Sequence, residues 1–241
     1  MIPKTIHYCW FGGKPLSKQT NKCIQSWRKY FPDYEIKEWN ESNFDVNIIT
    51  YTAEAYNEKK YAFVSDYARL WIMYYYGGIY FDTDVEVIKN MDEIISRGPY
   101  MGCEEEGVNP GLGVAASPGL GIYKELLDSY SKRHFINADG SLCLNTIVQY
   151  TTEILTLKGF QNTNIIQRID GVYIYPKQYF CPKNYQTGKI AITSDTKTIH
   201  HYTASWVTNS KLYTTIERVF GKAMCNWLIS LKIKLLRIRQ C

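Results

Sequence analysis

The chain has 241 residues, 45% hydrophobic and 21% charged, which excludes general disorder and allows a large buried core. All 23 acidic residues lie at or before Glu217, and six of the 28 basic residues follow it, so the net charge of +5 belongs to a cationic tail behind a nearly neutral body. Confinement of the basic excess to the tail, with no recognition motif, argues against nucleic-acid binding.

The cysteine pattern points to a reducing compartment. Seven cysteines are scattered without a Cys-x-x-Cys pair, which is neither a zinc pattern nor a disulfide framework. The first residues contain no apolar run of signal-peptide length, and no run approaches the ~20 apolar residues of a membrane span. We therefore expect a cytoplasmic protein.

Strand-like and helix-like segments alternate along the first half of the chain. Apolar runs and turn signals predict strands at 4–11, 34–39, 79–81, 85–88, 100–104, 112–116 and 196–199. Helical spacing predicts helices at 17–30, 61–76, 120–130 and 142–157, the first of them capped by Ser17. The alternation predicts an α/β fold with a mostly parallel sheet. The glycine turn after the first strand suits a nucleotide at the carboxyl edge of that sheet.

Asp82-Thr83-Asp84 is the strongest local signal. It follows the apolar residues 79–81, so the two aspartates are expected at the end of a buried strand. In an extended segment, side chains two apart project from one face. Two carboxylates so placed repel each other unless they share a cation, and oxygen ligands favour Mg²⁺ or Mn²⁺. A turn with two solvated acids is the alternative.

Two further segments carry polar candidates. Asp66 and Arg69 are three residues apart on the predicted helix before this strand, where they form either part of a site or a surface ion pair. His200 and His201 follow the last predicted strand, and either can complete a metal site or remain an ordinary strand-end histidine. The strand phase that would decide between them is not fixed by the sequence.

Glu104-Glu105-Glu106 and Asn109 form an acidic stretch after the predicted strand at 100–104. The stretch either lies near a bound sugar or acceptor or forms a solvated loop.

The tail after Glu217 has the pattern of a basic amphipathic helix. Apolar residues at helical spacing, including Trp227, alternate with Lys and Arg. Such a helix binds an anionic membrane surface or packs on its own domain. The charge split favours the membrane, and we expect a catalytic domain at 1–215 and this helix at 216–241.

Four stretches together resemble a known family. Residues 6–13, 63–70, 77–84 and 200–206 occur in the order found in DXD-containing glycosyltransferases. The order is similar to that in bacterial capsule and lipopolysaccharide sugar transferases, in fungal initiating mannosyltransferases and in the catalytic domain of the large clostridial glucosylating toxins. The resemblance implies a GT-A type nucleotide-sugar-binding fold, a Mn²⁺ or Mg²⁺ ion and a nucleotide-sugar donor, with UDP preferred.

Carried over by position, the resemblance gives each residue a role. Trp10 would stack on the nucleotide base, with Tyr8 and Cys9 along the same edge. Asp66 and Arg69 would hold the donor sugar and the diphosphate. Tyr80 and Asp82 would contact the ribose and the sugar. The metal would be held by Asp84 directly, with Asp82, His201 (or His200) and Ser205 completing its site. Trp206 would steady the leaving diphosphate. The toxins have an acidic residue before the Ser-x-Trp where this chain has histidines, which leaves the third metal ligand open.

The resemblance implies transfer of a hexose with retention, from UDP-galactose or UDP-glucose to a glycan or lipid-linked glycan in capsule or lipopolysaccharide synthesis. The enzyme would then lie at the inner face of the membrane. One alternative is a phosphatase of the haloacid-dehalogenase type, in which the first aspartate of such a motif is a nucleophile. Another is a non-catalytic subunit that binds a nucleotide sugar.

Overall fold

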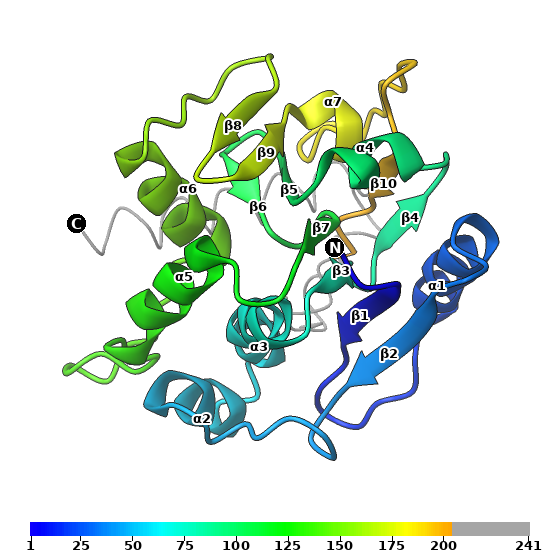
Figure 1. Cartoon of the computed structure of the whole chain (residues 1–241). Coiled ribbons are helices and arrows are strands. Elements are labelled where there is room, and N and C mark those ends of the chain that lie inside the picture. Colours follow the sequence, from blue (N-terminus) through cyan, green and yellow to red (C-terminus); the bar gives the residue numbers. More distant parts are fainter. Residues whose placement is uncertain (204–241) are drawn as a thin grey trace. The chain divides into compact units, whose positions relative to one another are not determined.

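The computed structural model describes residues 1–203 (Figure 1). These residues divide between two compact units, of which the first comprises Met1–Pro182 and Ile192–His201, and the second includes Lys183–Ala191. All the helices and strands below belong to the first unit. Its strands are β1 Thr5–Cys9, β2 Glu35–Trp39, β3 Gly78–Tyr80, β4 Val85–Val87, β5 Tyr100–Cys103, β6 Val108–Asn109, β7 Val114–Ala116, β8 Gln167–Ile169, β9 Val172–Tyr175 and β10 Thr198–His200. Its helices are α1 Lys18–Tyr30, α2 Thr50–Asn57, α3 Tyr61–Tyr75, α4 Asp92–Arg97, α5 Gly121–Ser131, α6 Ile147–Leu157 and α7 Lys177–Phe180.

The central sheet is mixed, whereas the sequence predicts a mostly parallel one. Its order is β2-β1-β3-β7-β5-β9-β8, with β6 on β5. Strand β1 is parallel to β2 and β3, and β5 is parallel to β9, but β6, β7 and β8 run against their neighbours. Strands β6, β7 and β8 contain only two or three residues each, too few to give a sequence pattern that distinguishes antiparallel from parallel strands. The α/β class itself is confirmed.

A second, two-stranded sheet joins β4 to β10 in antiparallel register. Its register pairs Val85 with His200. The pairing joins residues 115 positions apart in the chain, and it brings Asp84, which precedes Val85, close to His200.

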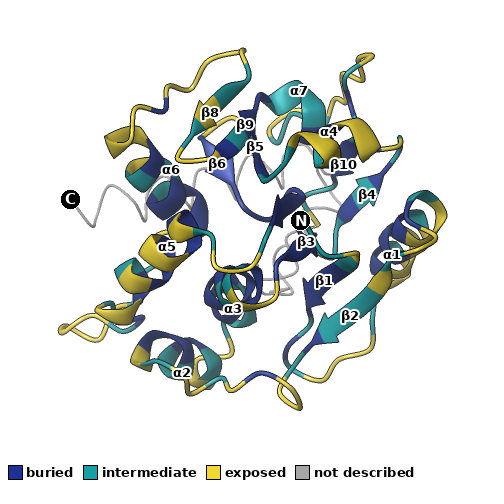
Figure 2. Cartoon of the chain, viewed as in Figure 1, coloured by how far each residue is buried: buried dark blue, intermediate teal, exposed yellow. Residues whose placement is uncertain are grey.

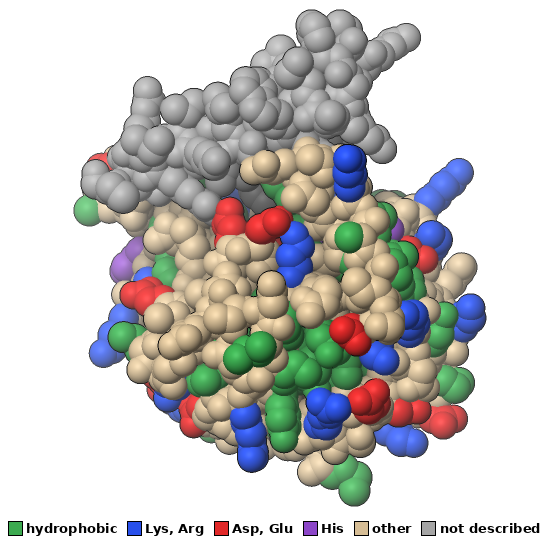
Figure 3. All heavy atoms as spheres, turned by 90° about the horizontal axis from the view of Figure 1, so that it is seen from above, with side chains coloured by type: hydrophobic (Ala, Val, Ile, Leu, Met, Phe, Trp, Pro, Cys, Tyr) green, Lys and Arg blue, Asp and Glu red, His purple; other side chains and the backbone are tan. Residues whose placement is uncertain are grey.

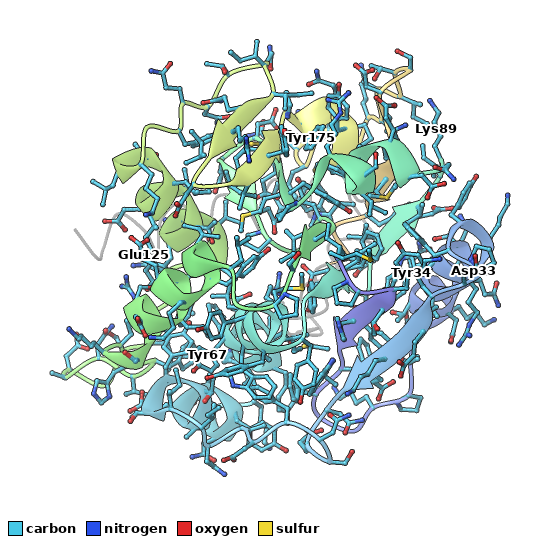
Figure 4. All side chains as sticks on the ribbon, viewed as in Figure 1. Asp33, Tyr34, Tyr67, Lys89, Glu125 and Tyr175 are labelled. Atoms are coloured by element: carbon cyan, nitrogen blue, oxygen red, sulfur yellow. The ribbon has the colours of Figure 1, made fainter. Side chains whose placement is uncertain are left out.

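Helix α3 lies at the centre of the core and packs on β1, β3 and α5 (Figures 1 and 2). Its buried face carries both apolar residues and the charged pair Asp66 and Arg69. Tyr67 of α3, which is labelled in Figure 4, belongs to the core. Its ring centroid lies 6.0 Å from that of Tyr130. Aromatic packing of this kind accounts for much of the high Tyr content.

Local sequence signals place the helix that begins at Lys18. The side-chain oxygen of Ser17 accepts a hydrogen bond from the backbone N–H of Thr20, which confirms the predicted cap. Helix α1 packs against β4, and its Trp27 donates its indole N–H to the Val85 carbonyl at 2.8 Å. This contact ties the strand after the Asp-x-Asp segment to the body of the fold.

The described surface carries charges of both signs. Figure 3 shows Lys and Arg interspersed with Asp and Glu on one face, in agreement with a nearly neutral body. Within residues 1–203, no helix is both long and apolar enough to cross a membrane. The predicted helix at 216–241 lies outside the described residues.

Candidate active site

A glycine turn sets the position of α3 against β3. Gly77 and Gly78 have φ angles of 64° and 88°, a conformation that L side chains rarely adopt. A Cβ at Gly78 would stand 2.5 Å from the Thr5 carbonyl oxygen, and one at Gly77 would stand 2.6 Å from that of Ala116. The turn therefore requires glycine twice, and it brings the charged face of α3 next to the residues that follow β3.

Arg69 is held between two carboxylates at the centre of this site. Its Nη2 lies 3.1 Å from Asp66 Oδ1 and 3.0 Å from Asp82 Oδ1, and its Nη1 donates to Asp82 Oδ2 at 3.1 Å. The Tyr80 hydroxyl donates to Asp82 Oδ1 at 3.2 Å, and the Tyr80 ring lies 5.0 Å from the guanidinium carbon. Bidentate contact between guanidinium and carboxylate fixes both groups in one plane. The pair at 66 and 69 is thus buried, which excludes the surface ion pair and leaves its part in a site a prediction.

Burial perturbs the acids of this cluster in the same direction. It raises the pKa of Asp66 to about 6, against the opposing effect of Arg69, while the Asp82 charge adds to the rise. Burial, together with the charge of Asp84, also raises the pKa of Asp82 despite Arg69. Titratable groups perturbed in this way by burial and like charge are typical of functional sites.

Asp82-Thr83-Asp84 forms a turn and not the extended segment that the sequence predicts. The Val85 N–H donates to the Asp82 carbonyl at 3.0 Å, closing the turn, and the Asp82 N–H donates to the Gly111 carbonyl at 2.9 Å. The turn gives the two carboxylates different partners. The argument for a shared face by two-residue periodicity is therefore wrong, because that periodicity holds only in a strand.

Asp84 has a histidine partner, and that partner is His200. The Nε2 of His200 lies 3.2 Å from Asp84 Oδ1, and both side chains are almost fully buried. Burial disfavours the charged imidazole, but the Asp84 carboxylate outweighs it and raises the pKa of His200 well above its ordinary value. His201, the predicted metal ligand, instead places its Nε2 2.8 Å from Glu86 Oε2. The structure thus brings the alternative, His200, to the acid pair, because consecutive strand residues face opposite sides.

The predicted base-binding residues are separated by the same alternation. The Tyr8 hydroxyl donates to Glu38 on β2 at 2.6 Å, and its ring packs on Trp27. Cys9, on the opposite face of β1, is buried near Tyr80 and Arg69, and burial raises the pKa of its thiol to about 12. Trp10 is half-buried and donates its indole N–H to the Lys14 carbonyl at 2.5 Å. The prediction that Tyr8 and Cys9 line the same edge is therefore wrong. Of the three residues, only Trp10 is partly accessible.

The loop at 104–111 lies against Asp82 through Gly111, a residue that was not predicted from the sequence. Asn109 donates to Glu104 Oε2 at 2.9 Å and accepts from the Gly111 N–H at 2.7 Å. A Cβ on Gly111 would lie only 1.8 Å from Asp82 Oδ2. The backbone of this loop therefore lies directly against the Asp82 carboxylate, and Pro110-Gly111 is the local signal that marks it. Glu105 instead pairs with Lys177 at 2.8 Å.

Ser205 and Trp206, the predicted third metal ligand and diphosphate donor, lie outside the described residues. Their roles stay predictions.

Several known proteins are similar to this chain in sequence. Residues 17–100 match the family described as glycosyltransferase sugar-binding region containing DXD motif, a range that includes Arg69, Asp82 and Asp84. The chain is 26% identical over 111 residues to inositol phosphoceramide mannosyltransferase 1 of Schizosaccharomyces pombe, covering 42% of the chain and 33% of that protein. The match thus spans about a third of the length of this curated relative.

A second relative is matched over most of its length. It is an uncharacterized glycosyltransferase of Acanthamoeba polyphaga mimivirus, 26% identical over 204 residues, covering 76% of the chain and 77% of that protein. Among solved structures, the PaToxG glycosyltransferase is similar with a TM-score of 0.48 and 21% identity, over 65% of this chain and 68% of that one. Over residues 17–100 the chain is therefore similar to the family described as glycosyltransferase sugar-binding region containing DXD motif, with Asp82-Thr83-Asp84 in the place of that motif.

Proposed function

We propose that the protein is a metal-dependent retaining glycosyltransferase that transfers a hexose from a nucleotide sugar, with UDP-glucose or UDP-galactose as donor. The observation that carries the proposal is the Arg69 guanidinium held between Asp66 and Asp82 within the family-matched segment, next to the Asp84–His200 pair. Charged hydrogen-bonding groups in fixed positions are what recognition of a sugar diphosphate requires.

Asp82 and Arg69 serve the donor sugar in this proposal. The Asp82 side chain is 26% exposed although both of its oxygens contact Arg69, so it retains lone pairs that can accept hydrogen bonds from sugar hydroxyls. Arg69 is 5% exposed and keeps that carboxylate ionised and oriented. The pair therefore acts as a rigid acceptor and not as a mobile charge.

Asp84 and His200 suit a divalent cation. Their facing O and N atoms are 3.2 Å apart, close to the ~3 Å between neighbouring ligands of an octahedral ion with bonds of about 2.1 Å. A carboxylate oxygen with an imidazole nitrogen is a donor set that fits Mn²⁺ or Mg²⁺, the latter through its oxygen. When bound, such an ion supplies positive charge to the departing diphosphate. Asp82, already paired with Arg69, would face the ion less directly than Asp84.

The acceptor in this proposal is a glycan or lipid-linked glycan of a cell-surface polysaccharide. The name of the fungal relative indicates a mannose donor and an inositol phosphoceramide acceptor as the alternative to test. The basic residues after Glu217 would hold the enzyme at the inner face of the membrane, where a lipid-linked acceptor is presented.

Donor hydrolysis in the presence of Mn²⁺ tests the proposal. The full chain is incubated with UDP-glucose, UDP-galactose, UDP-N-acetylglucosamine and GDP-mannose, with and without EDTA, and released nucleotide is measured. We expect turnover of a UDP-hexose that EDTA abolishes. Proton NMR of the transferred sugar then checks retention of the anomeric configuration. Turnover that is unaffected by EDTA contradicts the metal role.

Two aspartate variants sharpen the test. Asp84→Asn should abolish both turnover and Mn²⁺-dependent UDP binding, whereas Asp128→Asn, which removes an exposed carboxylate from a surface pair with Lys124, should leave both unchanged. Full activity in Asp84→Asn would remove the metal from the mechanism. Tight Mn²⁺-dependent UDP binding without turnover of any donor would favour the non-catalytic subunit. Release of phosphate from simple esters would favour the phosphatase, for which Asp82 is poorly placed because Arg69 and Tyr80 engage its oxygens.

A further inference from the structure

Three side chains of types that bind metal ions lie close together beside Asp84. Glu104, Cys181 and His200 each place one ligand atom so that the three atoms lie within 4.8 Å of one another. Cys181 is 0% exposed and His200 is 9% exposed, while Glu104 is half-buried. The three residues come from the ends of β5, α7 and β10, which all belong to the first unit.

Backbone contacts hold these three segments together. The Thr198 hydroxyl donates to the Phe180 carbonyl at 2.8 Å, and the Lys197 N–H donates to the Tyr179 carbonyl at 2.7 Å, which ties β10 to α7. The Phe180 ring fits against Gly102 of β5 so closely that a Cβ there would stand 2.5 Å from it. The residues that follow each segment are thus placed near one another by the fold itself.

The chemistry of the three ligands differs from that of the Asp-x-Asp turn. A thiolate, an imidazole and a carboxylate together form a borderline-soft set that favours Zn²⁺ over Mg²⁺ or Mn²⁺. Neighbouring ligand atoms of a tetrahedral zinc ion are about 3.3–3.7 Å apart. The three ligand atoms, which lie within 4.8 Å of one another, therefore have to approach one another by only roughly 1 Å to bind the ion. Three protein ligands leave the fourth position of the ion to water, as in open zinc sites.

We propose that Glu104, Cys181 and His200 form a Zn²⁺ site that inhibits the enzyme by competing for His200. The imidazole of His200 lies between two sets of groups, with Asp84 Oδ1 at 3.2 Å from its Nε2 and the ligand atoms of Cys181 and Glu104 within 4.8 Å of one of its nitrogens. When Zn²⁺ is bound by Cys181, Glu104 and His200, the His200 imidazole no longer pairs with Asp84 to bind the catalytic cation. The inhibitory part rests on the proposed function, whereas Zn²⁺ binding itself does not.

Zn²⁺ binding is measured first, without any nucleotide sugar. The full chain, with Cys225 and Cys241 replaced by serine, competes for Zn²⁺ with a chromogenic chelator, and Co²⁺ substitution reports a thiolate-to-cobalt charge-transfer band. We expect one ion per chain. In Cys181→Ser the charge-transfer band should be lost and the affinity should fall by at least ~10-fold. The matched control is Cys143→Ser, a half-buried cysteine that contacts Tyr150 and should retain both signals.

Inhibition is measured second, as donor hydrolysis at saturating Mn²⁺ with increasing Zn²⁺. Cys181→Ser, which should keep its turnover, should need at least ~10-fold more Zn²⁺ for half-inhibition than the Cys143→Ser control. Circular dichroism checks that both variants are folded. Equal Zn²⁺ affinity in the two variants overturns the site, and equal inhibition overturns the competition. A chain that binds Zn²⁺ through Cys181 but turns over no donor contradicts the proposed function and leaves the site intact.

Discussion

Gly111→Ala probes the donor site without removing any functional group. A Cβ at this position would stand 1.8 Å from Asp82 Oδ2 and 2.6 Å from Arg69 Nη1. Because ordinary contact begins at 3.4 Å, the carboxylate or the loop must move by roughly 1.6 Å. Hydrogen bonds of 3.0 and 3.1 Å between Arg69 and Asp82 do not survive such a shift.

The size of the expected effect follows from that displacement. Misplacing a group that positions a substrate by ~1 Å costs about 100-fold in rate. We therefore expect kcat/KM for donor hydrolysis to fall about 100-fold, which corresponds to ~2.7 kcal/mol of transition-state stabilisation. Overpacking of this kind lowers the free energy of unfolding by about 1–3 kcal/mol, which leaves most of the chain folded.

Initial rates of Mn²⁺-dependent nucleotide release give kcat/KM, and urea titration gives the free energy of unfolding. The control is Gly121→Ala at the first residue of α5, where a Cβ meets no atom within 4 Å and both quantities should stay near those of the wild type. If Gly111→Ala keeps kcat/KM within about twofold of the wild type, the contact between Arg69 and Asp82 has no part in donor recognition.

The remaining predictions concern other parts of the chain. Burial lowers the pKa of His7 to about 4, so between pH 6.5 and 4 the unfolded chain binds a proton that the folded chain does not. The free energy of unfolding therefore decreases as the pH falls through this range, by up to about 3 kcal/mol. Urea titrations across this range should show a shallower loss in His7→Gln, whose amide can still accept from Trp39; an unchanged slope contradicts the assignment. Trp10→Ala should raise the donor KM more than it lowers kcat, and equal KM values would exclude base stacking. Deletion of residues 218–241 should reduce cosedimentation with anionic vesicles and spare donor hydrolysis, since each Lys or Arg contributes about 1 kcal/mol at such a surface.

Local sequence signals predicted the helix and turn that build the site. Apolar spacing at 61–76 and the glycine pair after it match α3 and the turn into β3, because both features depend on neighbours within a few residues. Helix α2 was not predicted. Its buried residues are Tyr51, Thr52 and Ala55, too few and too polar to give a helical apolar pattern.

Contacts between distant segments could not be predicted in the same way. The choice between His200 and His201 depends on the register of β10 against β4, which pairs His200 with Val85. A strand of three residues contains no periodicity from which its phase can be derived. The approach of Gly111 to Asp82 likewise depends on a loop whose path is fixed by hydrogen bonds to Asn109 and Asp82.

The charges of the described site explain why a cation should be needed at all. Asp66 and Asp82 contact the Arg69 guanidinium, and Asp84 contacts His200, whose raised pKa favours the protonated imidazole. Three carboxylates against these two cations leave an excess of negative charge among largely buried groups. This excess of negative charge disfavours the approach of a nucleotide diphosphate. In the proposed function, a divalent ion in place of the proton on His200 would cancel that excess, because a histidine ligand is neutral while the ion brings two positive charges. The proposed function therefore predicts that donor binding and metal binding are coupled by the electrostatics of the Asp84–His200 pair, whichever sugar the donor carries.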